Sequence, residues 1–295
     1  MSEPTFPGAV PPERNAAVVS SGVRLHLVEW GDPSAPPLLL CHGMWDHARS
    51  FSVLAPLLAR RFRVIALDAR GHGASEWGHA YTWLEDVRDV VTVMRWVNRP
   101  LHLVGHSRGG GQVTDAARAL PEAVIKLVSI DGFGPPPFDA NEPPPSQRLA
   151  QFLEARRQLA TRDRWRPYPS LGDLVERRLA QNPRLSREWL RYFAFHAARQ
   201  DDDGWRWRAD PHMAMEAGPW RPEWLDDVYA TLRVPLLAIV GSEADTWGPL
   251  PQRILDRRLR GVGQLTRRTV SGAGHFVHIE CPVATADLIL DYLDG

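Results

Sequence analysis

Apolar runs bounded by turn residues alternate along much of the chain with segments of helical period. The apolar runs predict strands at residues 24–30, 37–41, 63–68, 101–105, 126–131, 235–241 and 265–270. The amphipathic segments predict helices at residues 46–59, 82–97, 107–120, 251–259 and 282–293. This alternation predicts the α/β class, with a mostly parallel central sheet flanked by helices. In open sheets of this kind, active sites gather at the carboxyl ends of the strands.

One long interval, residues 134–222, breaks the alternation because it contains no convincing strand. It begins with proline-rich chain and then offers helical windows at 146–160, 171–181 and 186–199. We interpret it as a helical insertion that divides the core into residues 1–133 and 223–295. Most of its tryptophans are expected to form the core of this small subdomain, namely Trp165, Trp189, Trp205, Trp207 and Trp220.

Charge and composition narrow the classes of partner. The chain has 35 basic and 35 acidic residues, which argues against nucleic acid or an anionic membrane and favours a small neutral substrate. No run approaches the roughly 18 apolar residues of a membrane span, and the N-terminal residues do not resemble a secretory signal, so a cytoplasmic protein is expected. Two cysteines, Cys41 and Cys281, are expected to be reduced thiols.

The segment 101–111 combines a predicted strand, the pattern Gly105-His106-Ser107-Arg108-Gly109 and a predicted helix. The five-residue pattern alone is weak, but this strand-to-helix context is that of a nucleophile elbow. A sharp turn lifts the serine hydroxyl out of the sheet, and its tight backbone leaves no room for a Cβ at either glycine. The helix also aims free N–H groups and its positive end at the reacting centre.

A serine hydroxyl is a weak nucleophile at neutral pH, so it needs a base, and the base needs a third group to orient it. His275 lies in a glycine-rich loop between the last predicted strand and the last helix, while Asp245 lies in the loop after the strand at 235–241. The sequence therefore predicts a catalytic set of Ser107, Asp245 and His275. His275 would act as general base and then as general acid, and Asp245 would fix its tautomer.

Other residues compete for these roles. Glu243 lies close to Asp245, and Asp131 ends the strand before the insertion, so either carboxylate is an alternative acid. His278 lies three residues after His275, but only His275 directly follows the glycine turn. The remaining histidines at strand ends and in turns are expected to be hydrogen-bonded scaffold: His42, His72, His102 and His106.

Two further motifs complete a resemblance to a known family. Residues 38–44, which end in His42-Gly43-Met44, are similar to the HG strand end of the α/β-hydrolase family, and residues 68–75 are similar to its D-x-R-G-x-G-x-S turn. The chain resembles a cap-containing α/β-hydrolase over almost everything outside 134–222. The resemblance implies an oxyanion hole formed by the backbone N–H groups of Met44 and Arg108, and a cap between the sixth and seventh strands of the fold.

The nucleophile type narrows the expected reaction. Family members with aspartate at the elbow include dehalogenases and epoxide hydrolases, so Ser107 favours ester, lactone, thioester, amide or carbon–carbon bond hydrolysis. A small-molecule substrate, most simply a hydrophobic ester, is expected to be cleaved through an acyl-enzyme without a cofactor. Trp45 and Trp247 adjoin the site loops and either line the acyl pocket or pack against the cap. Arg108 departs from the small or apolar residue common after the nucleophile in the family, and it either favours an acidic substrate group or is held in a salt bridge.

Two other classes of function are compatible with parts of the sequence. The run from His42 to His47 matches three of the four ligand positions of a metallo-β-lactamase-like H-x-H-x-D-H motif, but Met44 replaces one histidine. A ligand receptor that kept the hydrolase pocket would carry the same catalytic set. Loss of activity to a chelator would favour the metal enzyme, and an acyl-enzyme burst without turnover would favour the receptor.

Overall fold

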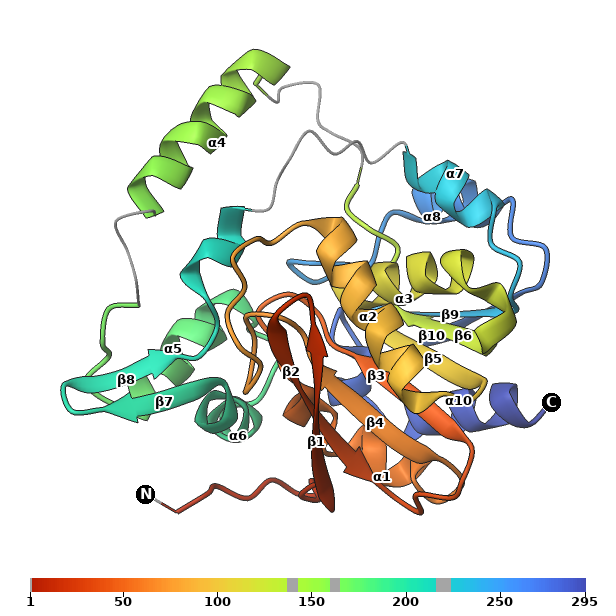
Figure 1. Ribbon diagram of the computed structural model, residues 1–295, viewed down its shortest axis with the longest axis horizontal. Coiled ribbons are helices and arrows are strands. Elements are labelled where there is room, and N and C mark those ends of the chain that lie inside the picture. The colour runs from red at the N-terminus through yellow and green to blue at the C-terminus, as the bar shows by residue number, and fades with distance from the viewer. Residues whose placement is uncertain (1, 137–142, 160–164, 216–223) are drawn as a thin grey trace.

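An eight-stranded sheet forms the centre of the molecule (Figure 1). The computed structural model describes residues 2–136, 143–159, 165–215 and 224–295. The sheet has the strand order β1-β2-β4-β3-β5-β6-β9-β10, where β1 and β2 join antiparallel and all strands from β4 onward run parallel. Its strands are β1 (Arg14–Ser20), β2 (Val23–Trp30), β3 (Pro37–Cys41), β4 (Arg63–Asp68), β5 (Leu101–His106), β6 (Val124–Ile130), β9 (Leu236–Gly241) and β10 (Leu265–Val270).

The predicted α/β class is confirmed, and the burial pattern explains why. Every residue of β3 and of β5 is buried, as expected for parallel strands that are covered on both faces. β1 instead alternates between half-buried and exposed residues at the edge of the sheet. This strand was not predicted, because its apolar run in Arg-Asn-Ala-Ala-Val-Val-Ser is only four residues long and half of it is alanine, which is not enriched in strands.

Helices cover both faces of the sheet (Figure 1). One apolar cluster joins the sheet to α2 (Trp83–Val97), α3 (Arg108–Ala119), α7 (Trp224–Ala230) and α8 (Gln252–Leu259). The other joins it to the 3-10 helix η1 (Ala48–Phe51), α1 (Leu54–Leu58), α9 (Val277–Glu280) and α10 (Pro282–Asp294). The single helix predicted at residues 46–59 is therefore wrong: this segment forms two short helices instead.

The segment between β6 and β9 builds a third apolar cluster away from the sheet. Its described elements are α4 (Pro145–Leu159), α5 (Leu171–Gln181), α6 (Arg187–Ala197), β7 (Ala198–Asp201), β8 (Gly204–Trp207), η3 (Pro211–Met215) and α7. Trp189 and Trp205 are buried in the cluster, as expected, whereas Trp220 lies outside the described residues. The absence of strands predicted here is wrong, because β7 and β8 pair as an antiparallel hairpin. These strands of four residues are too short and polar to show a clear periodicity.

Two simpler predictions concern the cysteines and the membrane. Cys41 and Cys281 are both free thiols, as expected, and burial raises the pKa of Cys41 to about 12. Among the described residues, no helix has the length and apolar character that crossing a membrane requires.

Candidate active site

Ser107 occupies a sharp turn between β5 and α3. Its backbone has φ 52° and ψ −120°, a conformation that residues other than glycine rarely adopt. A Cβ at Gly105 would lie 2.3 Å from the Gly109 carbonyl oxygen, and one at Gly109 would lie 2.3 Å from that of Cys41. Neither position has room for a side chain, so this stretch has the backbone geometry of a nucleophile elbow.

His275 lies at the carboxyl edge of the sheet, in the loop after β10. Its Nδ1 lies 2.6 Å from Oδ2 of Asp131, and both side chains are buried. Asp131 directly follows β6, and its backbone N–H donates to Ile239 of β9. The Ser107 N–H donates to Ile130 at the end of β6, so the elbow and the Asp131 carboxylate belong to neighbouring strand ends.

The sequence predicts Asp245 as the acid, but the imidazole contacts Asp131 instead. Asp245 uses its carboxylate on backbone groups, because Oδ1 accepts from the Thr246 N–H at 2.6 Å and Oδ2 from the His275 N–H at 3.2 Å. It lies four residues beyond the end of β9, so its loop turns back over the edge of the sheet. The other alternative, Glu243, is exposed and bonds to the neighbouring Ser242 hydroxyl.

The backbone after β3 lies against the elbow. A Cβ at Gly43 would lie 3.1 Å from the Ser107 Cβ, so a side chain here would require its neighbours to shift. Met44 follows Gly43, and Arg108 begins α3 immediately after Ser107. Of the two residues of the expected oxyanion hole, Arg108 thus directly follows the serine, and Met44 directly follows the glycine that approaches it.

The Arg108 side chain points to an ionic partner within the protein. Its Nε and Nη2 donate to Oδ2 of Asp86 at 3.2 and 2.5 Å, and its guanidinium lies over the Trp83 ring. Gln112 donates to the same carboxylate oxygen. Of the two expectations for Arg108, the salt bridge is the one that the structure supports.

The two tryptophans expected near the pocket differ in their surroundings. Trp45 has φ 59° and makes an edge contact with Trp165, at 5.9 Å between ring centroids. This contact links the loop after β3 to the segment that precedes β8. Trp247 has 60% of its surface exposed. Within the described part of the expected cap, Trp45 therefore has an aromatic partner, whereas none is found for Trp247.

The turn after β4 makes hydrogen bonds that hold the chain after Gly43 and Met44 against the end of the sheet. Asp68 accepts hydrogen bonds from the backbone N–H groups of Ala48 and Ala74, and its Oδ2 contacts His26. Burial alone would raise the pKa of Asp68, but His26 and these hydrogen bonds outweigh it and hold the pKa well below the usual range. His72 shares this turn, with Nδ1 donating to the Arg70 carbonyl and Nε2 accepting from the Trp45 N–H.

Burial of His72 predicts a loss of stability in acid. Burial, aided by His42, lowers the pKa of His72 to about 3 from an ordinary value of 6.5. As the pH falls, His72 therefore takes up a proton in the unfolded chain before it does so in the folded protein. The contribution of His72 to the unfolding free energy is present above pH 6.5 and is lost as the pH falls toward the folded pKa. We expect about 2 kcal/mol of the unfolding free energy to disappear between about pH 7 and about pH 5 through this group.

Urea unfolding at the two pH values measures that loss. His72→Gln should lose about 2 kcal/mol less unfolding free energy than the wild type between the two pH values. His79→Gln, which alters an exposed histidine, should lose as much as the wild type. Equal losses in the wild type and His72→Gln would contradict the prediction.

The metal-binding run suggested by the sequence does not converge on one point. His42 uses both ring nitrogens, since Nδ1 donates to the Gly43 carbonyl and Nε2 accepts from the Ala69 N–H. His47 contacts the Phe193 carbonyl through Nε2. Within the described part of the chain, only Asp46 of this run belongs to a group with metal-binding geometry, and its companions are His106 and His278.

The loop of His275 is held by contacts that the sequence does not predict. The Nε2–H of His106 donates to the His275 carbonyl at 3.0 Å, so the residue before the nucleophile anchors the backbone of the histidine loop. Gly248 lies against the other side of the imidazole, because a Cβ there would be 3.1 Å from the His275 Nδ1. The His106 contact had no sequence signal beyond its place next to Ser107.

Comparisons with known proteins agree with the fold. Residues 38–288 match the model of the alpha/beta hydrolase family. A serine hydrolase-like protein of Danio rerio is 25% identical over 274 residues, covering 90% of this chain and 83% of the relative. The thioesterase domain from the curacin biosynthetic pathway is 24% identical with a TM-score of 0.82, covering 94% of this chain and 99% of that one.

A second solved structure, of an esterase from M. tuberculosis, is 24% identical with a TM-score of 0.74, covering 97% of this chain and 93% of that one. Likeness at this level of identity concerns the fold. The fold and the strand-terminal site define a hydrolase of the α/β type. The match over most of its length shows that the chain belongs to the alpha/beta hydrolase family.

Proposed function

We propose that the protein is a serine hydrolase that cleaves a small-molecule ester, or a related acyl bond, through an acyl-enzyme. The observation that carries the proposal is the buried contact between His275 and Asp131 at 2.6 Å, beside an elbow that holds Ser107 at φ 52°. A serine in this conformation, with a histidine and carboxylate pair at the adjoining strand ends, has the parts that acyl transfer requires. The serine hydrolase-like relative of Danio rerio agrees with this reading.

In the proposed reaction, the Ser107 oxygen attacks the acyl carbon while His275 takes the hydroxyl proton. The bond to the leaving alcohol then breaks, and the protonated imidazole returns the proton to the departing oxygen. Water attacks the acyl-enzyme by the same route, releases the acid and restores the serine. In this proposal no cofactor takes part in the formation or the hydrolysis of the acyl-enzyme.

Asp131 is the acid in this proposal. A buried carboxylate that accepts from Nδ1–H fixes the tautomer in which Nε2 can accept the serine proton, and it stabilises the imidazolium that forms. Asp245 becomes a positioning residue, because it holds the backbone N–H of His275. The backbone N–H groups of Met44 and Arg108 would stabilise the oxyanion, supported by the approach of Gly43 to Ser107 and by the start of α3 at Arg108.

The surroundings favour an uncharged acyl group. The salt bridge to Asp86 balances the Arg108 guanidinium, which removes the reason to expect an acidic substrate. Residues 134–222 are proposed as the cap, with Trp45 against Trp165 at its boundary with the core. Activity on acyl esters of graded chain length, with lactones, thioesters and amides alongside, would define the substrate class.

A fluorophosphonate probe tests the nucleophile. It should label the wild-type protein at Ser107, because the probe reacts with an activated serine hydroxyl. Mass spectrometry should find the adduct on the peptide that contains Ser107. Ser107→Ala should abolish labelling, whereas Ser242→Ala, at the carboxyl end of β9, should leave it unchanged. Unchanged labelling of Ser107→Ala would overturn the proposal.

A further inference from the structure

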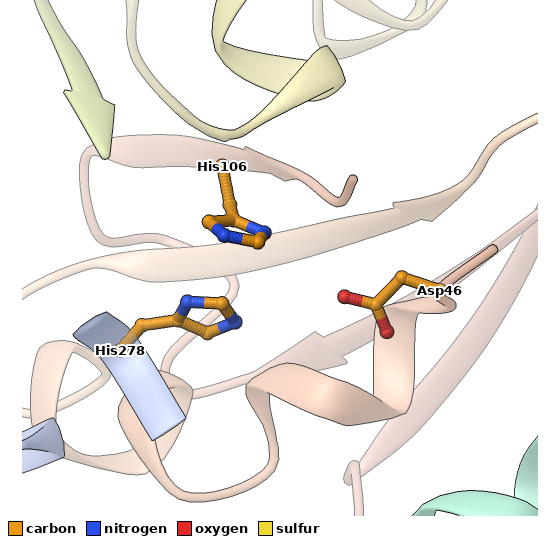
Figure 2. A group of neighbouring side chains, drawn as sticks. All are labelled: Asp46, His106 and His278. Atoms are coloured by element: carbon orange, nitrogen blue, oxygen red, sulfur yellow. The ribbon is translucent and has the colours of Figure 1, made fainter. Parts of the chain in front are cut away.

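Three buried side chains converge beside the histidine loop, outside the contact between His275 and Asp131. Asp46 precedes η1, His106 ends β5, and His278 lies in α9. Each offers a ligand atom, and these atoms all lie within 4.8 Å of one another. Figure 2 shows the two imidazole rings and the carboxylate pointing toward a common centre. Elements distant in sequence thus bring two nitrogen donors and one oxygen donor together.

The three groups present polar atoms without hydrogen-bond partners. Among the described residues, His106 Nδ1 and both ring nitrogens of His278 are buried and have none, and Asp46 Oδ2 has no hydrogen bond of normal geometry, although the Ser50 hydroxyl and the Arg178 guanidinium act on this carboxylate. Each side chain is at least nine-tenths buried. Buried polar atoms left without a partner cost roughly 1–3 kcal/mol each, so their concentration here indicates a bound species that contacts one atom of each side chain.

The hydrogen bond at the far side of His106 fixes its protonation. Since the His275 carbonyl accepts a hydrogen bond, the proton of His106 lies on Nε2, and Nδ1 carries a free lone pair directed at the cluster. A histidine that ligates a metal typically donates its other ring N–H to a carbonyl or carboxylate in this way. Asp46 is held similarly, because its Oδ1 accepts from the His47 N–H at 2.7 Å and leaves Oδ2 for a ligand.

The chemistry of the donors also suits a cation. His106 and His278 each offer an imidazole nitrogen, and neutral imidazole is the form that binds metals. The Asp46 carboxylate supplies the negative charge that a cation attracts.

We propose that Asp46, His106 and His278 form a binding site for a divalent transition-metal ion of the zinc type. Two imidazole nitrogens and one carboxylate oxygen are the donors that such an ion prefers, with water as the fourth ligand of a tetrahedron. Ca²⁺ and Mg²⁺ prefer oxygen donors throughout and fit this set poorly. The site is separate from the proposed reaction, because its ligands are not those that contact the acyl group, and it does not depend on the proposed function.

Titration calorimetry with ZnCl₂ on chelator-treated wild-type protein tests the site directly. We expect one ion per chain, and Co²⁺ in place of Zn²⁺ should give the visible absorption of a tetrahedral site. His278→Gln and Asp46→Asn each remove one ligand and should weaken binding at least ~100-fold, because loss of even an outer-shell partner costs ~10–100-fold. Two variants are used so that the test survives if one of them fails to fold, as checked by circular dichroism.

The control is His102→Gln. His102 is another buried histidine of β5 whose Nδ1 has no partner among the described residues, but its ring packs against Phe62 instead. This variant should bind the ion as the wild type does, and so should Ser107→Ala, which separates the metal site from the hydrolase activity. The proposal is overturned if the wild type takes up no stoichiometric ion, which would mean that water fills the cluster. Undiminished binding by both ligand variants would also overturn it, since the ion would then lie elsewhere.

Discussion

Asp131→Asn is expected to lower kcat about 10,000-fold, with little change in the unfolding free energy. The asparagine has the shape of the aspartate, but its amide can present an N–H group to the ring. His275 would then carry its proton on Nε2, the atom that must accept the proton of Ser107, and the imidazolium would lose its counter-charge. The 2.6 Å contact with Nδ1 is where this change acts.

Asp245→Asn is the matched control, because it also converts one carboxylate near His275 into an amide. Oδ1 and Oδ2 of Asp245 accept from backbone N–H groups, and the amide oxygen of asparagine can replace one of these two contacts. We expect a loss in kcat of about 10-fold from the shifted loop. Steady-state kinetics on one activated ester compare the two variants. If Asp245→Asn were the more damaging, the acid would be Asp245, as the sequence first suggested.

The elbow was predictable from sequence because its constraints are local. A strand, two glycines around Ser107 and a helix start lie within a few residues, and the steric need for Gly105 and Gly109 follows from the turn itself. The strand bounds of β3, β4 and β10 were also predicted correctly, since continuous or bounded apolar runs report burial directly.

The choice between Asp131 and Asp245 was not predictable, because it depends on contacts between strands. β6 and β9 are parallel neighbours, so both carboxylates lie beyond the same edge of the sheet. Sequence spacing gives no measure of which one reaches the ring. The Asp131 N–H still pairs with β9, which keeps its carboxylate at the edge, whereas the loop of Asp245 is long enough to turn its side chain to backbone donors.

The convergence of Asp46, His106 and His278 could not be predicted from the sequence either. The three residues come from three separate elements, and each is common in scaffold positions. Only the packing of α9 against the end of β5 brings the two imidazoles to 4.4 Å between centroids. The sequence instead suggests a metal-binding run from His42 to His47, because these residues lie close along the chain. In the structure both side chains contact other partners.

Gly248→Ala is expected to lower kcat at least ~100-fold by separating Asp131 from His275. A Cβ at this position would lie 2.1 Å from Asp131 Oδ2 and 3.1 Å from His275 Nδ1, so the contact between these atoms cannot persist unchanged. A displacement of about 1 Å in a catalytic group is enough for a loss of this size. Asp245 ties the loop of Gly248 to the histidine loop, because its N–H donates to the Gly248 carbonyl and its Oδ2 accepts from the His275 N–H.

Gly263→Ala provides the control, because a Cβ there meets no atom within 4 Å. Both variants add one methyl group at a loop glycine whose φ is not positive. They should therefore reduce the conformational entropy of the unfolded chain by similar amounts. Steady-state kinetics and thermal unfolding should show Gly263→Ala close to the wild type in both respects. Gly248→Ala should lose kcat while the fluorophosphonate still labels it, more slowly, at Ser107. Equal kcat in the two variants would mean that the pair of His275 and Asp131 does not set the rate.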